Sequence, residues 1–172
     1  MGEHTVFTIP KDRQKVTLYL DRGVILQGEI FLDMFAADLS VHQKVSAFFE
    51  SPVQFFPIQL AQTGDTEFIN KSHVGMAEVN VPVEQDTEYF SIRLMHKIPV
   101  TAMLLHGDEI NGDLMAEVPE DRNRLSDCLN LPQRFISLRE GAMIHYINKN
   151  ALRKVVHRVQ TGQELQLDTD EA

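Results

Sequence analysis

The chain has 172 residues, of which 43% are hydrophobic and 24% charged, an ordinary composition for a globular protein of one domain or two small ones. Its formal net charge of -9 argues against a general electrostatic grip on nucleic acid or an anionic membrane, because such binding depends on basic residues. Cys128 is the only cysteine, which excludes an intramolecular disulfide and the paired-cysteine metal motifs. The sequence contains no apolar stretch near the ~18 residues of a membrane helix and no apolar signal core, so we expect a cytoplasmic protein without membrane association.

The first elements along the chain are two strands. Hydrophobic and polar residues alternate from Val16 to Leu20 and again from Val24 to Leu32, which is the period of half-buried strands. Gly23 lies between them and is typical of a tight hairpin turn. Gly28 falls on the inward face of the second strand, where a glycine indicates a sharp bend or a close backbone approach.

A short helix and three further strands follow in the first half. Hydrophobic residues at positions 41, 45, 48 and 49 have helical spacing, and Pro52 lies just past the expected end of the helix. Strand patterns return at 54–60, 67–70 and 74–81. We interpret the dense phenylalanines of this region, Phe55 among them, as core residues.

The second half repeats these blocks in the same order. Residues 16–30 match residues 100–114 at an offset of 84, residues 46–55 match 126–135 at an offset of 80, and Ile-Asn-Lys recurs at 69–71 and 147–149, an offset of 78. A shorter block at 6–9 matches 89–92 at an offset of 83. The order is kept and the offset changes only where loops absorb insertions, which predicts an internal duplication. We expect domains at 1–84 and 85–160, followed by an acidic disordered tail at 161–172.

The repeated motifs resemble those of a known superfamily. The pattern V-x-L-x-L-x-x-G-x-x-x-x-G-x-I at 16–30 resembles the first half of the Sm-like (LSm) signature, and "FINKSHVGMAEV" and "YINKNALRKVV" resemble its second half. The block R-L-S-D-x-L-N-x-P-x-x-F at 124–135 is similar to an uncharacterised bacterial family of Sm-like domains. The resemblance implies a mainly β fold of two tandem Sm-like or SH3-like small β-barrels from an internal duplication, each with a short inserted α-helix, packed on one another.

RNA binding transfers poorly from this resemblance. RNA-binding Sm-like proteins carry an Asp-x-x-x-Asn-type stretch after the second strand, and neither "FLDMFAADLS" nor "MAEVPEDRNR" has it. The Arg-Gly of the second signature is replaced by Asn70-Lys71 and Asn148-Lys149. We keep RNA or nucleotide binding at these two turns as the alternative function.

Each candidate site also has a purely structural interpretation. Asn70-Lys71 and Asn148-Lys149 are ordinary turn chemistry, with the asparagines capping amides and the lysines solvated, or else they line a ligand groove. Arg153, Lys154 and Arg158 on the last strand either protect an exposed sheet edge by their charge or contact an acidic partner or nucleic acid. Met34 and Phe35, between strand and helix, are either core residues or an exposed apolar pair for a partner.

The sequence offers little for catalysis. The seven histidines have no metal-binding spacing, and no nucleotide-binding or nucleophile motif is present, so we predict no metal and no cofactor. A Cys128–His145 dyad is the remaining enzymatic hypothesis. We therefore predict a non-catalytic protein-interaction or scaffold module of a bacterial cytoplasm that forms a homo-oligomer or binds a protein partner through open strand edges.

Overall fold

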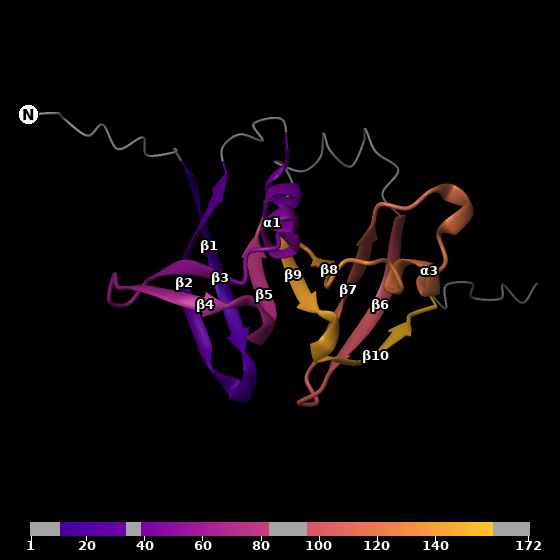
Figure 1. The fold of residues 1–172 in the computed structure, drawn as a ribbon. Helices are drawn as coiled ribbons and strands as arrows, with labels where there is room; N and C mark the ends of the chain where they lie inside the picture. Colours follow the sequence, from indigo (N-terminus) through magenta and orange to yellow (C-terminus); the bar gives the residue numbers. More distant parts are fainter. Residues whose placement is uncertain (1–10, 34–38, 83–95, 160–172) are drawn as a thin grey trace, which may run out of the picture.

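The computed structural model describes residues 11–33, 39–82 and 96–159, and shows a mainly β chain (Figure 1). Below, 11–82 without its gap is the first half and 96–159 the second half. The strands are β1 (Lys11–Leu20), β2 (Ile25–Asp33), β3 (Phe55–Leu60), β4 (Thr66–Asn70), β5 (Val74–Asn80), β6 (His96–Leu104), β7 (Glu109–Ala116), β8 (Phe135–Glu140), β9 (Met143–Asn148) and β10 (Leu152–His157). The α-helices are α1 (Val41–Glu50) and α3 (Leu125–Leu129), and short 3₁₀ turns occupy Asp21–Gly23, Lys71–His73, Glu120–Arg122 and Lys149–Ala151.

These strands form one antiparallel sheet in the order β10-β6-β7-β8-β9-β5-β1-β2-β3-β4. Within the described ranges the sheet does not close on itself, and β10 and β4 are its two outer strands. The prediction of a mainly β chain is confirmed, whereas two separate closed barrels stay a prediction. The matching blocks at 6–9 and 89–92, the boundary between the domains and the acidic tail lie outside the described residues.

The two halves have the same strand order and the same register. The first half runs β5-β1-β2-β3-β4 across the sheet, and the second half runs β10-β6-β7-β8-β9. Val16 pairs with Gly28 in the first half, as Val100 pairs with Gly112 in the second. The ladder between β1 and β5 has a register irregularity next to Leu20. The ladder between β6 and β10 has one at the matching place, next to Leu152. We call residues at matching positions of the two halves counterparts.

The sequence pattern explains where the helix α1 begins and which face it buries. Ser40 Oγ accepts a hydrogen bond from the Gln43 backbone N–H at 3.2 Å, and the Gln43 side-chain carbonyl accepts one from the Ser40 N–H at 3.0 Å. This capping box satisfies amides that the first turn of a helix leaves unpaired. Val45 and Phe49 lie one turn apart and are fully buried against the sheet.

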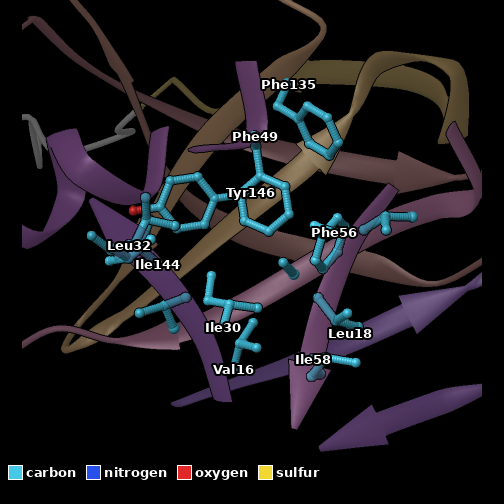
Figure 2. Close-up of a cluster of buried hydrophobic side chains, with 14 of the residues drawn as sticks. Val16, Leu18, Ile30, Leu32, Phe49, Phe56, Ile58, Phe135, Ile144 and Tyr146 are labelled. Atoms are coloured by element: carbon cyan, nitrogen blue, oxygen red, sulfur yellow. The ribbon is translucent and has the colours of Figure 1, made fainter. Parts of the chain in front are cut away.

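The core has two clusters that exchange residues between the halves. The first surrounds α1 and includes Phe49, Phe56 and Ile30 of the first half together with Tyr146 of β9 (Figure 2). The second lies in the second half but includes Met76 of β5. Because β5 and β9 are neighbours in the sheet, their side chains complete each other's cores and join the halves into one packed body.

Candidate functional site

The two asparagines of the repeated Asn-Lys pairs cap their own turns. The Asn70 side-chain oxygen accepts a hydrogen bond from the Ser72 N–H at 3.1 Å. Its counterpart Asn148 accepts one from the Asn150 N–H at 3.0 Å. Each asparagine therefore fixes the 3₁₀ turn that follows it, which is the structural interpretation made from the sequence.

The two lysines bind backbone carbonyls at helix ends instead of lying in solvent. Lys71 Nζ donates to the carbonyl oxygens of Phe48 and Ser51, both at 2.9 Å, and its side chain is only 2% exposed. Lys149 Nζ donates to the Leu131 carbonyl at 2.5 Å. The expectation of solvated lysines is therefore wrong for Lys71, because the last carbonyls of α1 have no intrahelical partner and take an ammonium group instead.

Burial lowers the pKa of both Lys71 and Lys149, because desolvation disfavours the charged form. The neighbouring Arg134 lowers the pKa of Lys71 further, while Glu50 acts in the opposite direction on both lysines. These contacts within the chain account for the geometry that the two turns share. Ligand binding at Asn70, Lys71, Asn148 and Lys149 stays a prediction.

The basic cluster of the last strand lies at one end of the sheet. Arg153, Lys154 and Arg158 are exposed on or beside β10, the outer strand. Arg153 donates to the Leu105 carbonyl at 2.9 Å, and Arg158 donates to the Gly112 carbonyl at 3.3 Å. Arg153 thus binds the turn that follows β6, and Arg158 binds β7, the second strand in from the outer strand. Protection of the open strand by these charges stays a prediction. The other two residues of the predicted interaction surface, Met34 and Phe35, lie outside the described residues.

Tyr146 is the centre of the junction between the halves. It lies on β9 opposite Ala77 of β5, is fully buried, and stacks on Phe49 with 5.7 Å between the ring centroids (Figure 2). Its hydroxyl oxygen lies 2.9 Å from His42 Nδ1. A side chain of the second half therefore completes the core around the helix of the first half.

Glu50 and Phe135 extend this junction. The Glu50 carboxylate, at the end of α1, accepts hydrogen bonds from the backbone N–H groups of Arg134 at 3.0 Å and Phe135 at 2.8 Å. The Phe135 ring is buried, 5.1 Å from that of Phe49 between centroids. Apolar packing and charge-assisted hydrogen bonds thus act together where the second half meets α1.

The counterparts of these two buried aromatic residues are exposed. Phe68, on the outer strand β4, is the counterpart of Tyr146 and is 69% exposed. Phe55, on β3, is the counterpart of Phe135 and is 53% exposed, so the interpretation of Phe55 as a core residue is wrong. The offset of 78 that aligns the two Ile-Asn-Lys motifs also aligns Phe68 with Tyr146, and this was the signal available in the sequence.

Tyr19 is part of a polar group beside the same junction. Its hydroxyl donates to Glu78 Oε2 at 2.8 Å, and Glu78 Oε1 lies 3.3 Å from His145 Nδ1. The other ring nitrogen of His145 is 3.5 Å from Glu140, and although these are ion-pair distances, neither nitrogen has hydrogen-bond geometry. The two nitrogens of His145, on β9, therefore face carboxylates of the two neighbouring strands, β5 and β8.

This group predicts a spectroscopic and a stability effect at alkaline pH. Burial and the Glu78 carboxylate raise the pKa of Tyr19 from 10.0 to about 12. The unfolded chain ionises first as the pH rises, so the stabilisation is complete below pH ~10 and is lost as the pH passes the folded pKa. The phenolate absorbance difference between wild type and Tyr19→Phe should have a midpoint about two pH units above the ordinary value. A midpoint at the ordinary value would contradict the Tyr19–Glu78 contact.

Cys128, one member of the hypothetical dyad with His145, lies in the core. Cys128 is 4% exposed, and burial raises the pKa of its thiol, which disfavours the reactive thiolate. It borders a cleft of about 400 Å³ between α1 and the strands β7 and β8, where Gln43 and Gln133 supply polar groups. These amides can hydrogen-bond a small polar molecule, but the buried thiol is not activated to attack one.

The state of Cys128 gives a direct prediction. In the folded protein a neutral alkylating reagent should label Cys128 slowly, because the thiol is buried and protonated at neutral pH. The same reagent should label the chain rapidly in denaturant, which serves as the control. Rapid labelling of the folded protein would revive the hypothesis of a Cys128–His145 dyad.

Comparison of the chain with protein-family models, with curated proteins and with solved structures gives no match. The Sm-like resemblance thus rests on the sequence motifs alone. None of the helices in the described ranges is long and apolar enough to cross a membrane. The same ranges bring together no group of three or more His, Cys, Asp or Glu side chains that is placed to hold a metal ion.

Proposed function

We propose that the chain is a non-catalytic protein-interaction or scaffold module of a bacterial cytoplasm, made of two Sm-like units that arose by internal duplication. Shared strand order and shared register support the duplication, since the strand pairs among β1 to β5 recur among β6 to β10. The Sm-like signatures support the identity of the unit. The internal β5–β9 junction supports an interaction role, because it is itself an association of two units through strand edges.

The observation that carries this proposal is the pair of open edges with aromatic residues beside one of them. Among the described strands β4 and β10 end the sheet, and an outer strand presents N–H and C=O groups that another polypeptide can pair with. Phe55 and Phe68 lie on the same face of the β3–β4 pair, because Phe55 is opposite Asn70 and Phe68 is opposite Pro57. Two large exposed aromatic rings on one face of a sheet edge are typical of a protein-binding surface.

A pull-down from a bacterial extract with matched variants tests this function. The wild-type chain and Ile25→Ser should retain the same proteins, because Ile25 is exposed but lies on β2, away from both outer strands. The double variant Phe55→Ser/Phe68→Ser should lose them. Equal retention by all three proteins, or no retention by any, would contradict an interaction role for this edge.

RNA or nucleotide binding is the second candidate, and the exposed basic residues Arg153, Lys154 and Arg158 favour it. A fluorescent oligonucleotide titrated with the chain should then bind with an affinity that falls steeply as salt rises. Lys154→Ala should weaken that binding. A flat titration at low salt would remove this candidate and leave the interaction module unaffected.

A further inference from the structure

We propose that the β10 edge of one chain pairs with the β4 edge of a second copy and so repeats, between molecules, the junction that β5 and β9 form within one. This inference rests on the proposed interaction function and names its partner. The two open edges are the counterparts of the two strands that already pair. β10 corresponds to β5, because Ala102 pairs with Val155 as Leu18 pairs with Ala77. β4 corresponds to β9, because Phe55 pairs with Asn70 as Phe135 pairs with Asn148.

The backbone of β10 is oriented for this pairing. At the internal junction the Val81 N–H donates to the Ala142 carbonyl at 2.7 Å, so alternate amides of β5 point towards β9. The Arg158 N–H points inward, to the Pro99 carbonyl at 2.8 Å, and alternation then directs the amides of Val155 and His157 outward. When the two open edges pair in the register of the internal junction, Val155 lies opposite Phe68, just as Ala77 lies opposite Tyr146.

The exposed aromatic residues fit the same arrangement. Phe68 would occupy the position of Tyr146, which is covered by the helix of the preceding unit. The preceding unit in the proposed contact is the second half of the other chain, with its helix α3. There Leu125 and Leu129 are only partly buried, although their counterparts Val45 and Phe49 are fully buried. Within the described ranges both surfaces are thus less covered by apolar neighbours than their counterparts at the internal junction.

The charges of the two edges are complementary. In the register of the internal junction, Arg158 lies opposite Asp65, and Lys154 and Arg158 lie diagonally across from Glu67. All four side chains are exposed in the single chain. Opposite charges across neighbouring strands stabilise the pairing and set its direction, whereas two β4 edges or two β10 edges would bring like charges together.

The described strands leave one edge of each kind, which makes the contact head-to-tail. A contact between two different surfaces continues from copy to copy until it closes into a ring or extends as a filament. Blocking one edge in one variant and the other edge in a second variant should therefore stop growth at a single contact.

Two single variants and their mixture test the proposal by light scattering at micromolar concentration. Phe68→Ser disables the β4 edge. His157→Pro removes an outward amide from β10, and because the neighbouring Arg158 N–H is the one that points to β6, it removes no backbone donor from the β6 side. The wild type and the control Ile25→Ser should be oligomeric, each edge variant monomeric, and the equimolar mixture of the two edge variants a heterodimer. High salt should weaken the assembly.

Two kinds of result would overturn the proposal. The first is a monomeric wild type. The second, with circular dichroism showing that both edge variants are folded, is edge variants that keep the wild-type mass or a mixture that stays monomeric. These results are distinguishable from failure of the proposed function. A monomer that still retains a different protein in the pull-down, and loses it with Phe55→Ser/Phe68→Ser, keeps the interaction role and removes only the second copy as partner.

Discussion

Tyr146→Ala is expected to lower the free energy of unfolding by about 3–5 kcal/mol, the range for removing a large buried aromatic side chain. The ring is fully buried between the halves and stacks on Phe49, and its hydroxyl group meets His42. The variant leaves a cavity in the first core cluster and removes the hydroxyl group that lies 2.9 Å from His42 Nδ1. Chemical denaturation of wild type and variant measures the difference.

Phe68→Ala is the matched control for Tyr146→Ala, because the two residues are counterparts and differ mainly in burial. With 69% of its side chain exposed, Phe68 should contribute less than about 1 kcal/mol to the stability of a dilute, monomeric chain. Similar losses for the two variants would contradict the description of β5–β9 as the junction that buries this position.

Gly28→Ala is expected to be the second strongly destabilising change, with a loss of about 3 kcal/mol. A Cβ at position 28 would clash with the Gln59 carbonyl oxygen and would lie 2.9 Å from the Ile58 side chain. The obstacle is the backbone of β3, which cannot move without breaking its ladder. Thermal unfolding of the variant should show a clearly lower midpoint.

Gly112 and Gly75 provide the comparison for this prediction. Gly112, the counterpart of Gly28, would place a Cβ 2.8 Å from the Arg139 carbonyl oxygen, so Gly112→Ala should also destabilise the chain. At Gly75 the nearest atom would be 3.4 Å away, an ordinary contact, and Gly75→Ala should change stability little. If Gly75→Ala costs as much as Gly28→Ala, close backbone approach is not the reason for the glycine.

Local patterns in the sequence were sufficient for the elements of each half. The alternation around Val16 and the helical spacing around Val45 predicted β1 and α1, since each depends on the face that the residue itself buries. The inward position of Gly28 predicted the close approach to β3 that the structure shows. The repeated blocks predicted the equal order of strands in the two halves.

The relation between the halves could not be predicted in this way. Pairing of β5 with β9 joins strands whose own patterns fit many neighbours, and nothing local specifies which edges meet. The burial of Lys71 could not be predicted for a related reason. Lysine is rarely buried, and the carbonyls that accept its hydrogen bonds are available only where α1 ends. The interpretation of Phe55 as a core residue was wrong because hydrophobicity does not reveal which end of a sheet stays open.

A map of cross-strand nuclear Overhauser contacts tests whether one unit is used twice and joined edge to edge. Paired contacts are expected in the two halves, such as Val16 with Gly28 and Val100 with Gly112, together with the junction contact between Glu78 and His145. Unequal registers in the two halves, or matching registers without the contact between Glu78 and His145, would contradict this arrangement.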